Sequence, residues 1–306
     1  MGMNRDRKAV ALALLALSCA ACGDDAAAPP KPPPRVQRAA PPAMIDGHDV
    51  TFYDAARAHK HWEGDWKGGQ RVGSWTWWHE NGQTAVQGQF ADGHEDGLWT
   101  EWYDSGAKKS ERGWKQGKVD GTWLEWYANG QKKIEGSCAA SMPVSAYVEY
   151  HANGQKKNEG QYANGKQEGH WQSWHDNGQK SSEGDFKDGQ QSGEWTSWYT
   201  DGKPEKRGAF VGGQNDGPWK RWYPNGNLQD EVTFKLGVSD GEAKSWHENG
   251  KIKAMGKLVD GKREGPWQCW KEDGARDDEQ SGVYHADEKT GALKPTDAGA
   301  TGDGPR

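Results

Sequence analysis

The chain has 306 residues, of which 43 are Gly and 19 are Trp, and only 33% are hydrophobic. So small an apolar share excludes a large aliphatic core of the kind that holds deep active sites, although aromatic rings can still order the chain. With 39 basic against 45 acidic residues, it lacks the concentrated basic footprint of a nucleic-acid-binding protein.

Residues 1–22 have the pattern of an export signal. Basic residues precede the apolar run from Ala9 to Leu17, small residues follow it, and the run is too short to span a bilayer permanently. The sequence around Cys19 and Cys22 resembles a bacterial lipobox, which implies lipidation of Cys22 or Cys19. Cys22 is preferred because Gly-Asp-Asp and a proline-rich stretch follow it. An ordinary cleaved signal is the alternative, and either signal predicts export. The lipobox predicts a lipid anchor at the periplasmic or surface face of the cell envelope.

Three further segments flank the central part of the chain. Residues 23–43 are rich in Pro and Ala, a composition that favours an extended polyproline II linker. Residues 44–72 are expected to form an N-terminal cap with a partial repeat. Residues 285–306, which are rich in small and polar residues, are expected to be a disordered tail.

Aromatic pairs recur every 24 residues within residues 73–284. The first ring of each pair is at Trp75, Trp99, Trp123, Tyr147, Trp171, Trp195, Trp219 and Trp267, with Ala243 in the eighth unit. The second-slot rings are Trp78, Trp102, Trp126, Tyr150, Trp174, Trp198, Trp222, Trp246 and Trp270. An Asn-Gly or similar doublet follows each pair, and such doublets between strand-forming runs predict hairpins with type I′ turns. The sequence therefore predicts an all-β fold, an elongated antiparallel array of about nine 24-residue hairpins in one twisted meander sheet.

The repeat resembles that of the bacterial MORN-repeat variant. One unit contains Gly169-His170-Trp171-Gln172-Ser173-Trp174-His175-Asp176-Asn177-Gly178, followed by Glu183-Gly184-Asp185-Phe186-Lys187-Asp188-Gly189. The resemblance covers about 210 residues and implies a hairpin-repeat fold. Members of that family are often labelled putative antitoxins, and eukaryotic relatives are described as scaffolds or lipid-associated proteins. The resemblance implies no catalytic residue.

A two-residue loop at Asn-Gly would pair Trp75 with Gly88 and Trp78 with Ala85. The first-slot ring would then fill the gap above a glycine of its hairpin partner, which indicates that this face is structural.

Loss of turn glycines in the fourth unit, around Ser141, suggests a hinge or a partner-specific site.

The second-slot rings would lie on the opposite face, with polar cross-strand neighbours such as Lys109 beside Trp102 and Lys133 beside Trp126. One interpretation is a solvated face whose rings are sheltered by lysine stems. The other is an aromatic stripe about 80 Å long that binds a partner.

No catalytic or metal-binding pattern emerges. The four histidines that follow second-slot rings alternate with Tyr and lie about 10 Å apart at best, and no third ligand column accompanies them. The column of Glu135, Glu159 and Glu183 lies beside lysines, as in a solvated sheet. We therefore expect no metal, no cofactor and no enzymatic activity. Cys138 and Cys269 are separated by about 50 Å of sheet, so we expect two free, buried thiols.

The favoured hypothesis is a non-enzymatic envelope lipoprotein that acts as a repeat scaffold for protein binding. The expected partners are an unknown protein or extended polymer at the envelope and, through the N-terminal lipid, the membrane, but not nucleic acid. Two alternatives stay open. One is a repeat protein that binds glycan or cell wall, and the other is an antitoxin or immunity-like protein that neutralises a partner, as the family labels suggest.

Overall fold

The computed structural model describes residues 46–293, and within this range it contains β-strands and no helix. The strands are β1 Gly47–Phe52, β2 Lys60–Lys67, β3 Gln70–Trp78, β4 Thr84–Ala91, β5 His94–Trp102, β6 Lys108–Lys115, β7 Lys118–Trp126, β8 Lys132–Ala139, β9 Met142–Tyr150, β10 Lys156–Ala163, β11 Lys166–Trp174, β12 Lys180–Lys187, β13 Gln190–Trp198, β14 Pro204–Val211, β15 Gln214–Trp222, β16 Leu228–Lys235, β17 Val238–Trp246, β18 Ile252–Val259, β19 Lys262–Cys269, β20 Gly282–His285 and β21 Glu288–Gly291. The expected signal peptide, both lipidation cysteines, the linker and residues 294–306 of the expected tail lie outside the described residues. Strand β21 lies inside the stretch for which the sequence predicts a tail.

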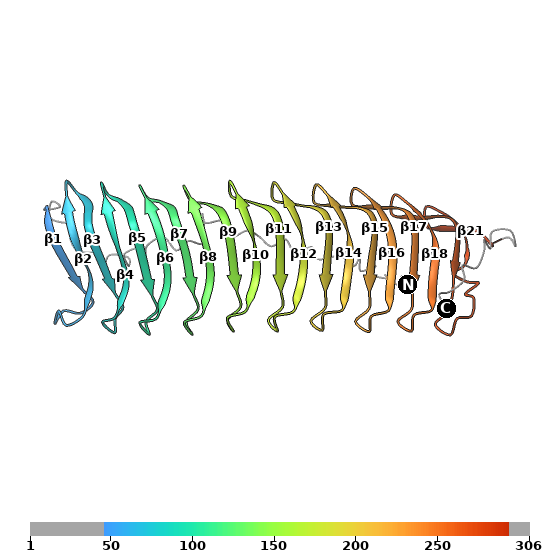
Figure 1. Cartoon of the computed structure of the whole chain (residues 1–306), viewed down its shortest axis with the longest axis horizontal. Coiled ribbons are helices and arrows are strands. Elements are labelled where there is room, and N and C mark those ends of the chain that lie inside the picture. The colour runs from blue at the N-terminus through green and yellow to red at the C-terminus, as the bar shows by residue number, and fades with distance from the viewer. Residues whose placement is uncertain (1–45, 294–306) are drawn as a thin grey trace, which may run out of the picture.

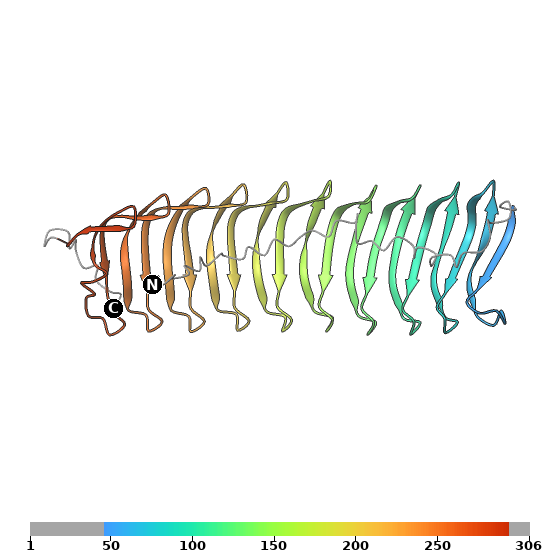
Figure 2. The same ribbon diagram turned by 180° about the vertical axis from the view of Figure 1, so that it is seen from behind.

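Each strand pairs with the next strand along the chain, and each pair is antiparallel. Figures 1 and 2 show the resulting open meander as one long row of strands, from β1 at one end to β21 at the other. This confirms the predicted all-β hairpin-repeat array. Strands β1 and β2 extend the sheet ahead of the first complete unit.

Two kinds of turn alternate along the sheet. The turn between β4 and β5 contains Asp92 and Gly93, with φ of 50° and 78°, between the paired residues Ala91 and His94. Positive φ at both central positions defines a type I′ turn, whose twist matches that of the strands it joins. The type I′ turns therefore lie between repeat units and not within them.

The Asn-Gly turn inside each unit has a different geometry from the one predicted. Gly82 has a φ of 84°, but Asn81 does not have a positive φ. The Gly82 amide donates to the His79 carbonyl at 2.9 Å, and the His79 amide donates to the Gln83 carbonyl at 2.8 Å. This is a three-residue loop, a type I turn followed by glycine in the left-handed region. Asn is favoured because its side chain donates to the carbonyl of Asp104 in the next unit, at 2.7 Å.

The longer loop changes the register near the turn. Trp75 pairs with Gly88 as predicted, but the ladder then shifts and Trp78 pairs with Thr84 instead of Ala85. The prediction is wrong here because a three-residue loop and a bulge replace the two-residue loop that it assumed. The same shift recurs in the other units, so the cross-strand neighbours of all second-slot rings move by one residue.

The first-slot rings form an aromatic layer on one face, which we call the inner face. The indole of Trp99 lies so close over Gly88 that a Cβ atom there would collide with the ring, and its Nε1 donates to the Gln89 carbonyl at 3.1 Å. The ring thus covers a glycine of the preceding strand, whereas the sequence predicted the hairpin partner. The pairing between β4 and β5 shifts register between Gln87 and Gln89, so Gly88 has no paired residue on β5. The Trp99 ring can therefore lie over Gly88 of the preceding strand. The same ring-on-glycine contact joins Trp75 to Gly64, Trp171 to Gly160, Trp195 to Gly184, Trp219 to Gly208 and Trp267 to Gly256.

Phenylalanine and tyrosine rings fill the spaces between these indoles. The Phe90 and Trp99 centroids are 5.0 Å apart with planes at 88°, and Phe186 and Trp195 repeat this contact at 5.0 Å and 86°. Such edge-to-face pairs add stability beyond their buried area. Trp75 is fully buried in this layer. The core therefore runs along the inner face as a row of aromatic rings, with smaller buried side chains such as Val119, Cys138 and Ala243 between them, and the described residues contain no helix to cover it.

The fourth unit keeps the sheet continuous in spite of its missing glycines. Strands β8 and β9 pair across the turn at Ala140 and Ser141, whose φ values are 49° and 68°. Ser145 occupies a position where the other units have glycine, and its φ is 63°. The turn geometry is thus retained by residues for which it is unfavourable.

The two cysteines within the described range differ. Cys269 is a buried free thiol, and burial raises its pKa. Because Cys269 is free, the predicted absence of a Cys138–Cys269 disulfide is confirmed. Cys138 is 2% exposed but is disulfide-bonded, so the prediction of a free thiol is wrong for this residue. The strand pattern predicts burial correctly for both, and burial does not determine whether a thiol is oxidised.

Candidate binding face

The second-slot rings lie on the outer face, opposite the inner aromatic layer. Each occupies the last position of an odd-numbered strand from β3 to β17, or directly follows β19, and each is half-buried. The structure brings together in one row all the rings that the sequence singled out, namely Trp78, Trp102, Trp126, Tyr150, Trp174, Trp198, Trp222, Trp246 and Trp270. We call this row the aromatic stripe.

Hydrogen bonds from a tyrosine or histidine of the preceding unit to the backbone carbonyl of each ring residue fix the backbone of the stripe. The Tyr103 hydroxyl donates to the Trp126 carbonyl at 2.9 Å, and His151 Nε2 lies 2.9 Å from the Trp174 carbonyl. A carbonyl oxygen can only accept, so Nε2 of this histidine carries the proton. Tyr and His interchange here because both reach the same acceptor. The other members of this cross-repeat ladder are Tyr53, His79, Tyr127, His175, Tyr199, Tyr223 and His247.

Lysines separate the rings in the N-terminal part of the stripe. Lys108 pairs with Trp102 and places its ammonium 5.6 Å from the ring centroid of Trp126 in the next unit. Lys109, the predicted neighbour of Trp102, instead forms an ion pair with Glu101 at 3.3 Å. Lysine ammonium groups lie over Trp78, Trp174 and Trp198 in the same way.

These lysines, and Lys132 at the equivalent position of another unit, also bind a glutamate three residues later. Lys156 and Glu159 are 2.8 Å apart, and Lys132 and Glu135 are 2.9 Å apart. Their lysines lie in register with Tyr150 and Trp126. This part of the stripe therefore matches the first interpretation, in which lysine stems shelter the rings.

Lys108, Lys132, Lys156 and Lys180 recur at the repeat spacing, and this lysine column ends at Lys180. The equivalent positions beyond it are Pro204, Leu228 and Ile252, which pair with Trp198, Trp222 and Trp246. Seven successive apolar side chains thus form what we call the apolar stretch, namely Trp198, Pro204, Trp222, Leu228, Trp246, Ile252 and Trp270.

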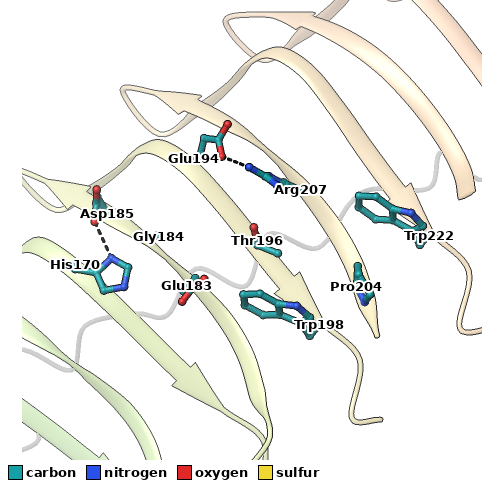
Figure 3. A pocket seen from close by; sticks show the side chains of 10 residues that line it. All are labelled: His170, Glu183, Gly184, Asp185, Glu194, Thr196, Trp198, Pro204, Arg207 and Trp222. Carbon is teal, nitrogen blue, oxygen red and sulfur yellow. Dashed lines mark hydrogen bonds and ion pairs between the residues drawn. The ribbon is translucent and has the colours of Figure 1, made fainter. Parts of the chain in front are cut away.

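A shallow groove of about 500 Å³ lies at the start of the apolar stretch. Figure 3 shows the rings of Trp198 and Trp222 with Pro204 between them. Thr196 and Gly184 also line the groove.

Charged side chains line the rest of the groove. Arg207 binds Glu194, and both side chains are exposed, at 57% and 70%. His170 and Asp185 lie 2.9 Å apart, and a dashed line joins them in Figure 3. A hydrogen bond from Lys180 lowers the pKa of the remaining carboxyl, Glu183, with smaller contributions from a Gln172 hydrogen bond and nearby positive charge. The groove thus combines two indoles with an excess of carboxylates, which favours a neutral or basic ligand.

Neither a metal-binding cluster nor a membrane-spanning helix is found among the described residues. Between residues 46 and 293, no three His, Cys, Asp or Glu side chains gather in a way that could hold a metal ion. The four ladder histidines each face a backbone carbonyl instead. No helix in this part of the chain is long and apolar enough to cross a bilayer.

From the sequence, Glu183 was considered as part of a carboxylate column, but Pro204, Asp185, Glu194 and Arg207 were not singled out. The signal was present, because a column of Lys108, Lys132, Lys156 and Lys180 at the repeat spacing ends where Pro204 begins. It was missed because the expected register assigned the neighbouring column, including Glu205, to the rings. A bulge of one residue is enough to make that assignment wrong.

Known proteins give limited further information. No curated protein matches the chain significantly. Among solved structures, the crystal structures of TcdB2-TccC3 and TcdB2-TccC3-Cdc42 are each similar over 73% of this chain and 14% of the other chain, with 11% identity and a TM-score of 0.19. The chain therefore spans about a seventh of those chains, and a likeness this distant carries no argument.

The repeat itself does match a known family. The model described as the MORN repeat variant matches residues 71–92, 119–137, 146–164, 167–188, 215–236 and 239–258. These six segments lie within the sheet and share its hairpin period. The chain is thus an array of hairpins, six of which match the MORN repeat variant.

Proposed function

We propose that the chain is a non-enzymatic repeat scaffold that binds another protein along the aromatic stripe. The observation that carries this proposal is the row of half-buried rings projecting at constant spacing from a sheet that does not need them for its core. Aromatic side chains are among the residue types enriched at protein interfaces.

The rigidity of the stripe supports this function. Its backbone is held by the cross-repeat ladder, and its Asn-Gly turns are joined by asparagine side chains, as in Asn153 to the Asp176 carbonyl at 2.6 Å. A preformed row of rings loses little conformational entropy when a partner binds. An extended partner contacts several units at once, so modest contacts at each ring add up.

We further propose that the protein is exported and anchored by lipid at a bacterial envelope. The export-signal pattern of residues 1–22 supports this, and it implies that the partner is an envelope protein. Metabolic labelling with a fatty acid, followed by fractionation, tests the anchor. We expect membrane-bound label in the parent and its loss in Cys22→Ser. Loss only in Cys19→Ser would assign lipidation to the other cysteine, and unlabelled protein would contradict the anchor.

Affinity capture from solubilised envelope tests the binding function. One variant carries Trp102→Ala, Trp126→Ala and Trp174→Ala, and a second carries Trp198→Ala, Trp222→Ala and Trp246→Ala. We expect a protein retained by the parent to be lost from at least one of them. Retention by both folded variants would contradict binding through the stripe.

The matched control for capture replaces exposed apolar residues outside the stripe. Leu98, Val211 and Val259 are 56%, 52% and 37% exposed, and their triple alanine variant removes apolar surface without touching a second-slot ring. We expect this variant to retain the partner. Loss of the partner from the control would show that binding depends on general surface hydrophobicity.

A further inference from the structure

We propose that the apolar stretch binds a proline-rich, basic polypeptide segment in the polyproline II conformation. This inference rests on the proposed function and specifies the chemistry of the partner at one part of the stripe. It starts from the end of the lysine column, because Pro204 opens the space that Lys180 and its equivalents occupy between the earlier rings.

The spacing of the rings selects this conformation. Successive second-slot rings are two strands apart, about 9.4–9.8 Å. A polyproline II helix has three residues per turn and presents the same side about every 9.3 Å. A peptide running across the strands would thus place every third residue between successive rings. An α-helix repeats about every 5.4 Å and a β-strand about every 6.8 Å, so neither keeps step with the rings.

The lining of the groove suits proline. The indoles of Trp198 and Trp222 stand on either side of Pro204, which leaves an apolar slot with aromatic walls (Figure 3). Aromatic-lined grooves bind polyproline II segments because the ligand is already extended and loses little entropy. Leu228 and Ile252 continue the apolar floor between the next rings.

The charges of the groove select a basic peptide. Glu183, Asp185 and Glu194 supply three carboxylates, against the guanidinium of Arg207, the imidazole of His170 and the Lys180 ammonium that binds Glu183. The Glu194 side chain is 70% exposed in spite of its ion pair, so a ligand ammonium can reach it. An attraction of this kind between exposed charges weakens as salt is added.

The chain itself supplies a suitable probe. Residues 29–38, with the sequence Pro-Pro-Lys-Pro-Pro-Pro-Arg-Val-Gln-Arg, combine prolines with three basic side chains. A synthetic peptide of this sequence is titrated into a low concentration of the full-length protein, and binding is followed by tryptophan fluorescence and calorimetry. We expect saturable binding that weakens with salt.

Two variants test the site without threatening the fold. Pro204→Lys restores the residue that four other units carry in this column, and Trp222→Ala removes one wall. We expect each to weaken peptide binding about tenfold or more, the usual loss when an aromatic anchor is removed. Leu98→Ala, at an exposed apolar residue outside the stripe, is the control and should leave binding unchanged. Parallel thermal unfolding checks that all three variants are folded.

Two results would overturn the proposal. One is equal binding of a peptide in which alanine replaces every proline while the charges remain. The other is the absence of binding by the proline-rich peptide. If a β-1,4-linked amino-sugar oligomer binds instead, and Pro204→Lys weakens that binding, the site is one for glycan and not for a peptide. In both cases the capture experiment still decides separately whether the stripe binds an envelope protein.

Discussion

Three non-glycine residues of the fourth unit have positive φ, a conformation that costs an L-residue roughly 1–2 kcal/mol. They are Ala140, Ser141 and Ser145. At the position of Ser145 the other units carry glycine, as at Gly169 with a φ of 66°. The fourth unit therefore keeps the repeat geometry at a local energetic cost.

Ser145→Gly should accordingly stabilise the protein. Relief of the strained φ, roughly 1–2 kcal/mol, exceeds the entropy cost of a new glycine, about 0.4–1 kcal/mol. The change is measured as a shift in the denaturant midpoint. Gly169→Ser is the matched reverse variant, because a Cβ atom there meets nothing within 4 Å and tests backbone strain alone. A lower midpoint for Ser145→Gly would contradict this account.

Glu125 is a second residue whose environment sets a measurable property. It accepts hydrogen bonds from Trp123 at 3.0 Å, Arg112 at 2.6 Å and Lys133 at 3.2 Å. Burial raises its pKa, but these hydrogen bonds and the positive charges outweigh burial, so the pKa is lowered overall. Arg112 occupies the glycine column here, and its ion pair replaces the usual ring-on-glycine contact.

The pH dependence of stability follows from this shift. Because the pKa is lower in the folded state, the stabilisation is complete above the unfolded value, about 4.3, and is lost as pH falls through the folded value. We expect the parent to lose more stability than Glu125→Gln between about pH 6 and pH 3. Unfolding midpoints of both proteins across that range test this. Parallel pH profiles would show that Glu125 contributes no such linkage.

At the scale of the strand pair, ring and glycine act as one packing unit. The eighth unit shows the alternative solution, since Ala243 replaces the ring and Val232 replaces the glycine that it would cover. The larger residue thus lies on the other strand of the pair, so its side chain replaces part of the volume that the missing ring would fill.

This exchange predicts coupling between Gly160 and Trp171. Gly160→Val alone should destabilise by about 1–3 kcal/mol or more, because any Cβ atom there collides with the indole. Trp171→Ala alone leaves a cavity and costs about 3–5 kcal/mol. The double variant should be less destabilised than the sum of the two, as denaturant unfolding of all four proteins in a double-mutant cycle would reveal. Strict additivity would contradict the packing unit.

The cross-repeat ladder joins one hairpin to the next. His151 and the tyrosines at equivalent positions make the same hydrogen bond to a backbone carbonyl of the following unit. His151→Tyr should therefore be tolerated, whereas Tyr127→Phe should cost about 1 kcal/mol by leaving the Tyr150 carbonyl without its partner. Chemical denaturation of both variants measures the difference. A large loss in His151→Tyr would contradict equivalence.

Across the whole molecule, the sequence was sufficient for the architecture. Tryptophan and glycine residues that recur at a fixed spacing identify the hairpins. The two strands of a hairpin, joined by a short turn, can pair only in the antiparallel sense. The pairing of Trp75 with Gly88 follows from the same columns. These features depend on the residues of the turns and on the periodicity of the chain, and both can be recognised in a single sequence.

The details that were mispredicted depend on backbone geometry that residue spacing does not encode. A two-residue and a three-residue loop both suit Asn-Gly, yet only the latter pairs Trp78 with Thr84. The direction in which Trp99 leans depends on a bulge in the neighbouring strand. The groove beside Pro204 follows from this register, so it was visible only after the strands were paired.

A repeat array stabilised by contacts between neighbouring units should tolerate the removal of a whole unit. Deletion of residues 169–192 joins Glu168 to Gly193 and restores every column, including a ring over Gly160, now supplied by Trp195. We expect a folded, shorter protein with a lower free energy of unfolding, since one unit and one interface are lost.

Deletion of half a unit is the informative contrast. Removing residues 175–186 takes out all of β12 except Lys187, including Gly184, on which Trp195 lies, and makes β13 the next strand after β11. Those two strands point the same way in the native sheet, so the shortened chain cannot pair them in the native sense. We expect loss of the cooperative unfolding transition, as monitored by tryptophan fluorescence and circular dichroism. Equal stability of the two deletions would mean that the 24-residue hairpin is not the unit that builds this sheet.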